Sequence, residues 1–165
     1  MTTILIGQQA KIKELIEDIC VNTFITKDAG GKLQGRPMST VEVDQDGCIW
    51  FFTNEYTGKT NDISHNKEVY LTYASPSKNS YVVIDGTAEL NDDANKIKEL
   101  WNPSLKAWFP EGLDDPKIQL IKVLPAHAEY WDGTSSKVVH AYQMLKAVIT
   151  GKEFDDGDHG EVNFN

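Results

Sequence analysis

Apolar residues near the start of the chain follow a helical period and then change to the spacing of strands. Residues 8–20 are predicted to form an amphipathic helix, because isoleucine or leucine recurs there every three or four positions. Three runs rich in β-branched and aromatic residues follow, joined by short turns that contain glycine. They predict strands over 21–27, 32–43 and 48–54. Turns this short favour an antiparallel meander, since parallel strands need long crossover connections.

The rest of the chain also alternates between strand and helix patterns. Strands are predicted over 69–73, over 81–90 with a bulge at Gly86, and over 126–131. Helical segments are predicted over 61–66, 92–101 and about 142–149. Residues 118–123 fit a helix or a strand, and Pro125 is predicted to end that segment. Residues 102–116 are predicted to be irregular.

About six strands with a few helices around them predict a mainly β fold with peripheral α-helices. A closed or nearly closed barrel suits so many short strands, because closure removes exposed sheet edges. No linker or repeat divides the chain. We therefore expect one domain over residues 1–151 and an acidic, flexible tail over 152–165.

The composition of the chain argues against several classes of function. The net charge of −9 disfavours binding to nucleic acid, which requires many basic residues. No apolar run approaches the ~20 residues that span a bilayer, and the start lacks the pattern of a signal peptide, so a cytoplasmic location is expected. The two cysteines and four histidines lack the spacing of metal ligands, so no metal site is expected.

The predicted strand over 32–43 carries the first candidate binding residues. Arg36 is the only arginine of the chain, and its rigid fork of donors suits a phosphate group. Pro37 cannot donate to a sheet ladder, which places this strand at an edge, bulge or opening. Ser39 and Thr40 add hydroxyl groups. The alternative is an ordinary surface arginine beside an edge proline.

Three further segments combine with this strand. Phe52 and Thr53 end a dense aromatic strand that offers a flat apolar surface and a hydroxyl. The segment 56–60, with Thr57 and Lys59, precedes a helical turn and could hold an anion. Trp101 and Trp108 flank a proline-rich segment and could line a pocket or an interface. The alternative for the aromatic strand is simple core packing, and for segment 56–60 an ordinary solvated loop. The alternative for the two tryptophans is local packing.

In this order, the segments resemble the general stress protein 26 branch of the pyridoxamine 5'-phosphate oxidase-like flavoproteins. The resemblance covers about residues 8–151 and rests on Arg36-Pro37-Met38-Ser39, Trp50–Thr53, Lys59, Val82–Gly86 with Ala88, Glu99–Trp101, Trp108–Gly112, Asp114–Pro116, Glu129–Trp131 and His140–Tyr142. It implies an FMN-binding, antiparallel, Greek-key-like split β-barrel. It also implies a homodimer with two flavin sites at the subunit interface.

The resemblance also implies roles for single residues. Arg36 and Lys59 would hold the flavin phosphate with help from Ser39 or Thr40, and Met38, Phe52 and Thr53 would contact the ring system. Tyr81 would be a polar contact, Trp131 of the partner subunit would cover the site, and Trp101 and Trp108 would shape its mouth. Pro37 and Thr57 complete the predicted cofactor-binding set. No catalytic side chain is predicted.

One departure narrows the function. Pyridoxamine 5'-phosphate oxidases carry a substrate-binding lysine five positions after the strand arginine, where this chain has Val41. We therefore predict an FMN-dependent oxidoreductase whose substrate differs from that of the pyridoxamine 5'-phosphate oxidases. Its partner would be a nicotinamide or another small-molecule reductant. The alternatives are a non-catalytic flavin-binding, storage or stress protein, and a protein for another cofactor such as FAD, a deazaflavin or haem.

Overall fold

The chain is described by a computed structural model over residues 5–54, 57–133, 137–153 and 157–164. Its elements follow one another as α1 (Gln8–Ile19), β1 (Val21–Lys27), β2 (Leu33–Ser39), β3 (Glu42–Val43), β4 (Ile49–Asn54), α2 (Gly58–His65), β5 (Glu68–Ser75), β6 (Ser80–Asn91), α3 (Ala94–Leu100), the 3₁₀ turns η1 (Pro103–Ala107) and η2 (Gly112–Asp114), β7 (Ile118–Asp132), α4 (Lys137–Thr150) and β8 (Asp158–Asn163).

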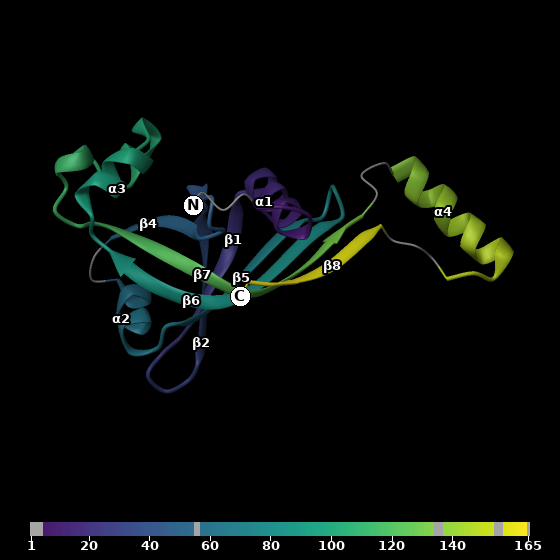
Figure 1. Ribbon diagram of the computed structural model, residues 1–165, viewed down its shortest axis with the longest axis horizontal. Helices are drawn as coiled ribbons and strands as arrows, with labels where there is room; N and C mark the ends of the chain where they lie inside the picture. The colour runs from purple at the N-terminus through teal and green to yellow at the C-terminus, as the bar shows by residue number, and fades with distance from the viewer. Residues whose placement is uncertain (1–4, 55–56, 134–136, 154–156, 165) are drawn as a thin grey trace.

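One antiparallel sheet forms the body of the protein, with its strands in the order β2-β1-β5-β6-β7-β4-β3 and β8 beside β7. The sheet curls into a half-barrel around the long strands β6 and β7 (Figure 1). Helix α1 covers part of the sheet, while α3 lies at one end of the molecule and α4 at the other. The predicted mainly β fold with peripheral helices is therefore confirmed, and its sheet is a curled half-barrel.

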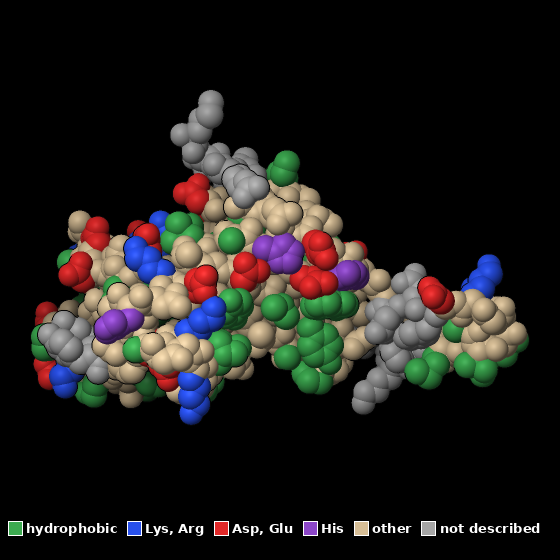
Figure 2. All heavy atoms as spheres, turned by 90° about the horizontal axis from the view of Figure 1, so that it is seen from below, with side chains coloured by type: hydrophobic (Ala, Val, Ile, Leu, Met, Phe, Trp, Pro, Cys, Tyr) green, Lys and Arg blue, Asp and Glu red, His purple; other side chains and the backbone are tan. Residues whose placement is uncertain are grey.

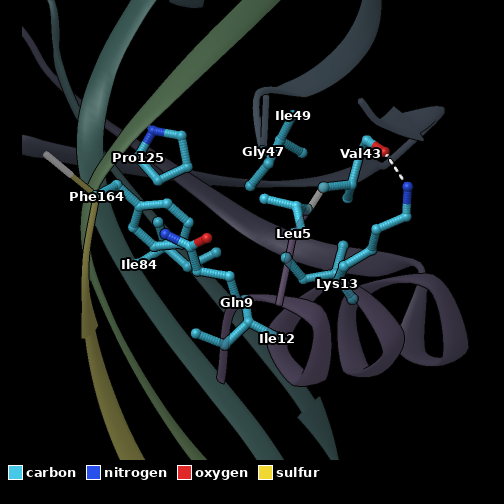
Figure 3. Close-up of a pocket in the computed structure, with 11 residues that line it drawn as sticks. Leu5, Gln9, Ile12, Lys13, Val43, Gly47, Ile49, Ile84, Pro125 and Phe164 are labelled. Carbon is cyan, nitrogen blue, oxygen red and sulfur yellow. Dashed lines mark hydrogen bonds between the residues drawn. The ribbon is translucent and has the colours of Figure 1, made fainter. Parts of the chain in front are cut away.

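The main core lies between α1 and the curled sheet. Strand β1 alternates buried and outward positions, so Phe24 points inward and meets Phe51 of β4 edge to face, with ring centroids 5.3 Å apart. Helix α1 buries Ile12, Leu15 and Ile16 against the same core. Figure 3 shows this contact, where the space left between α1 and the sheet is only about 10 Å³. Such a gap suits at most one water molecule and is not a ligand site.

A second apolar cluster lies at the end of the molecule that carries α3. Its buried members are Trp50, Ile97, Phe109, Ile118 and Leu120. The cluster joins α3 and the segment around η1 to strands β4 and β7. It thereby fixes the position of the irregular 102–116 segment against the aromatic strand β4.

The sequence identified several elements at or near their observed bounds. The first strand, the first helix and a bulge at Gly86 are confirmed, since the β6–β7 register shifts between Asp85 and Gly86. Two boundaries were wrong. The predicted 32–43 strand divides into β2 and β3, and the helical turn predicted over 61–66 is the longer helix α2.

Pro125 does not end a segment, contrary to the sequence prediction. It lies inside the continuous strand β7, opposite Gly86, at the point where the register shifts. A proline is tolerated there because a bulge removes the need for its missing N–H donor. The ambiguous residues 118–123 are therefore the first half of this strand.

Two further expectations need correction. Within the predicted flexible tail, Asp158–Asn163 form β8, which pairs with β7 and buries Val162 in the main core. The predicted pairing of the 32–43 strand with the aromatic strand is confirmed only at its end. The arginine-bearing β2 does not pair with β4, whereas β3 does, and the Val41 N–H donates to the Trp50 carbonyl group at 2.8 Å. The chain itself therefore leads from β2 to the edge of β4.

Candidate functional site

A pocket of about 420 Å³ opens where the two ends of the curled sheet meet. Its size lies in the range of small-molecule sites, about 300–1,000 Å³. Seven of the residues predicted from the sequence line it: Pro37, Met38, Ser39, Phe52, Thr53, Lys59 and Trp108. The pocket therefore unites the edge strand β2, the aromatic strand β4, the start of α2 and the end of η1.

The lining combines apolar surface with a few polar groups. Phe52 and Trp108 provide aromatic rings, and the Trp108 side chain is 67% exposed at the mouth. Thr53 is buried, and its hydroxyl group lies 3.4 Å from the carbonyl oxygen of Asn54. Pockets lined in this way bind small organic ligands and use their few polar groups to fix the ligand's orientation.

Lys59 is the only ionisable side chain in the lining within the described parts of the chain. Burial lowers its pKa from the usual 10.5, and the positive charge of Arg36 lowers it further. No carboxylate of the described residues contributes an opposing effect. Two cations therefore lie near each other beside an apolar pocket, an arrangement that an anion would stabilise.

Arg36 lies next to the pocket and does not line it. Its Nη1 donates to the Thr26 hydroxyl group at 2.8 Å, and its Nη2 lies 3.6 Å from Oδ2 of Asp62. The Thr26 hydroxyl group in turn donates to the same carboxylate oxygen at 2.7 Å. This buried network holds the guanidinium group in one orientation.

Three other predicted residues also lie outside the lining. The Thr40 hydroxyl group shares a 2.7 Å hydrogen bond with the phenol of Tyr73, whose pKa is raised by burial. Thr57 is the N-cap of α2, and its backbone N–H donates to the Thr60 hydroxyl group at 2.9 Å. Trp101 packs edge to face on Phe52, with ring centroids 6.0 Å apart, and supports the pocket wall from behind.

Tyr81 and Trp131 lie elsewhere on the molecule. They are register partners on β6 and β7 and line a second hollow of about 330 Å³. The Trp131 ring stacks on the ring of His159 from β8, with centroids 5.1 Å apart. Within one chain, these two residues do not join the pocket that contains Lys59.

Sequence reasoning missed five lining residues: Val21, Val41, Asn54, Leu105 and Phe109. Val41 and Asn54 directly follow the predicted site residues Thr40 and Thr53. Their positions next to these residues could therefore have indicated that they line the pocket. Phe109 lies next to Trp108 and is buried in the second apolar cluster, where it also lines the pocket. Only the fold shows that residues 102–116 form a wall of the pocket.

The described residues contain neither a metal-ligand cluster nor a membrane-spanning helix. No group of three or more histidine, cysteine, aspartate or glutamate side chains there could hold a metal ion. Among the helices that the structure describes, none is long and apolar enough to cross a membrane.

Comparisons with known proteins agree with this architecture. The chain is 28% identical over 155 residues to protein bli-3 of Neurospora crassa, which covers 86% of this chain and 74% of that protein. It is 28% identical over 80 residues to general stress protein 26 of Bacillus subtilis, which covers 47% of this chain and 56% of that protein.

Solved structures of related proteins share the fold of this chain. A protein from Jannaschia sp. assigned as a general stress protein 26 superposes with a TM-score of 0.80 at 25% identity, covering 94% of this chain and 98% of that one. The general stress FMN/FAD binding protein of Xanthomonas citri superposes with a TM-score of 0.67 at 26% identity, covering 78% and 90%. Residues 7–155 of this chain match the sequence pattern of one family, described as pyridoxamine 5'-phosphate oxidase like. The chain thus belongs to the pyridoxamine 5'-phosphate oxidase-like family and is related to general stress protein 26.

Proposed function

We propose that the protein binds FMN in the pocket between β2, β4 and η1. The observation that carries this proposal is the half-buried Lys59 ammonium group, which lies near Arg36 at one side of an otherwise apolar, aromatic pocket. A phosphate group would relieve the repulsion between the two cations, and the flat walls would take a fused ring system.

Residues of the chain then divide into two groups. Lys59 and Arg36 would hold the phosphate, and Ser39 would add a hydroxyl donor. Met38, Phe52, Thr53 and Trp108 would contact the ring system. The naming of the 26% identical Xanthomonas citri protein as an FMN/FAD binding protein supports a flavin. FMN is favoured over FAD because the family resemblance implies FMN.

The working unit in this proposal is a homodimer. Trp131 and Tyr81 are more than one third exposed and lie away from the pocket of their own chain. Trp131 of the partner subunit would cover the flavin site, as the family resemblance implies. Such a two-fold arrangement creates two equivalent sites.

We infer that the reaction is a flavin-dependent oxidation or reduction of a small molecule. A bound flavin would supply hydride or electron transfer, and the chain would bind and orient it and exclude water. Lys59, the one ionisable side chain in the described pocket lining, is assigned to the phosphate, so we propose no lining side chain for proton transfer. Val41 lines the pocket where the oxidases carry a substrate-binding lysine, which argues against pyridoxal phosphate synthesis.

A second candidate is a flavin-binding stress protein without turnover. The scarcity of ionisable groups in the pocket lining favours it. The two candidates differ in one measurement. An oxidoreductase is reduced by NADH or NADPH and reoxidised by an acceptor, whereas a storage protein binds flavin and stays inert.

The binding proposal is tested by titrating the purified full chain with FMN and recording its absorbance and fluorescence. We expect flavin binding with a well-defined endpoint and much weaker binding by Arg36→Ala. Light scattering on the same sample should give the mass of a dimer. A folded chain that ignores FMN would overturn the proposal.

A further inference from the structure

Helix α4 stands apart from the rest of the molecule. It makes no substantial contact with another helix or strand in the regions that the structure describes, and Figure 1 shows it beyond the end of the sheet. An isolated helix of 14 residues is marginally stable in water. The helix therefore requires a surface to pack on.

The apolar residues of α4 form one side of the helix. Tyr142, Leu145, Val148 and Ile149 are between 59% and 77% exposed, and at about 100° per residue they fall within one stripe. Figure 2 shows apolar side chains uncovered on this projecting helix. A stripe of this width is typical of a helix that covers a hydrophobic surface.

The charge of this region is opposite to that of the chain as a whole. Residues 133–152 contain three lysines and no aspartate or glutamate, whereas the whole chain has a net charge of −9. The helix is therefore attracted to an acidic surface. A second copy of the same chain offers one.

A matching surface lies at the other end of the molecule. Trp108 and Leu113 are 67% and 43% exposed beside η1 and η2. Glu111, Asp114 and Asp115 surround Leu113 in sequence, with Lys106 and Lys117 outside this stretch. Apolar residues framed by acids complement an apolar helix that carries lysines. Its own α4 lies at the opposite end of the molecule from this surface (Figure 1).

We propose that α4 of one copy docks on the η1–η2 segment of a second copy and closes the mouth of the pocket there. In a two-fold dimer with the copies side by side and antiparallel, the α4 end of each meets the η1–η2 end of the other. Trp108 belongs both to the pocket and to this surface, so the partner's α4 completes the site. The inference rests on the proposed homodimer but not on the flavin.

Hydrogen exchange of the full chain over a dilution series tests the contact. Amides of 141–150 and of 103–114 should gain protection together as the concentration rises, with α4 exchanging at least about tenfold more slowly in the dimer. Leu145→Asp should weaken dimerisation by about tenfold or more, because it puts a charge into an apolar contact. Ala147→Asp adds the same charge on the opposite side of the helix and should leave the dimer intact.

Mixing two variants shows which chain α4 contacts. In Leu113→Asp alone, α4 should exchange rapidly, because the surface on each partner is damaged. After mixing with Leu145→Asp, the α4 peptide of Leu113→Asp, distinguished by its mass, should become protected on the undamaged partner. No gain on mixing would overturn the inference.

The two proposals can fail separately. A dimer that binds FMN while α4 exchanges like an isolated helix at every concentration would overturn the docking and leave flavin binding intact. A chain that ignores FMN but shows the joint, concentration-dependent protection would support the docking and overturn the proposed function.

Discussion

Arg36 and Asp62 form an ion pair between the edge strand β2 and helix α2, with Nη2 3.6 Å from Oδ2. Their side chains are 24% and 10% exposed, so solvent screens the pair only in part. The pair joins the strand that forms one wall of the pocket to helix α2, which carries Lys59 in its first turn. It also leaves the guanidinium group positioned beside Lys59.

Removing the carboxylate of Asp62 should therefore destabilise the fold. Asp62→Ala leaves Arg36 without its counter-charge and the Thr26 hydroxyl group without its acceptor. We expect a loss of about 2 kcal/mol, which is a fall in melting temperature of about 4–8 °C for a chain of this length. Thermal unfolding followed by circular dichroism measures it.

A surface ion pair provides the matched control. Asp18 contacts Lys78 at 2.6 Å, with side chains 43% and 52% exposed, so Asp18→Ala should change stability by less than about 1 kcal/mol. Equal losses of stability in Asp62→Ala and Asp18→Ala would show that burial of the Arg36–Asp62 pair adds nothing to the stability of the fold.

Lys59→Gln should weaken FMN binding about tenfold or more, because a charge-assisted contact to phosphate is lost. Riboflavin lacks the phosphate group, so its affinity should change little. Fluorescence titration of both ligands measures the difference. Lys32→Gln, which alters an exposed lysine in the β1–β2 turn, should leave both affinities unchanged. An equal loss for FMN and riboflavin would argue against a phosphate contact.

Lys59 should also lower the stability of the free protein. Its pKa in the folded state lies below 10.5, so the unfolded chain binds more protons between the lowered pKa and 10.5. Stability therefore rises with pH in that window, and the full cost of burying the ammonium group is present below it. Lys59→Met should be more stable than the parent at neutral pH, and the difference should shrink as the pH approaches 10.5. Denaturant unfolding at several pH values checks the sign.

Gly86→Ala should destabilise the protein by about 1–3 kcal/mol. A Cβ atom there would collide with the carbonyl oxygen of Leu124 and lie 3.0 Å from Cα of Pro125, both on the backbone of β7. Gly58→Ala is the control, since nothing lies within 4 Å of its added Cβ. Urea unfolding compares the two, and equal stabilities would contradict the close approach of β6 and β7 at the bulge.

Local patterns in the sequence predicted most single elements, and they failed where distant residues decide the outcome. The strand at Val21–Lys27 is encoded by its own alternation. The passage of β7 through Pro125 depends on the bulge opposite Gly86, and β8 depends on burying Val162, so neither is visible in a local window.

The candidate site shows the same division. Residue types suited to a phosphorylated aromatic ligand identified Lys59, Phe52 and Trp108 correctly as neighbours. The reason given for their proximity was right only in part, because β2 itself does not pair with β4, while its continuation through Val41 into β3 does. The orientation of Arg36 toward Asp62 could not be predicted either, since it depends on the packing of α2 against β1.

A crystal structure of the full chain grown with FMN would show where the flavin binds. We expect a flavin between β2, β4 and η1, with its phosphate within hydrogen-bond distance of Lys59 and its ring against Met38 and Phe52. A flavin bound only in the hollow beside Tyr81 and Trp131, with the Lys59 pocket unaltered, would contradict this expectation.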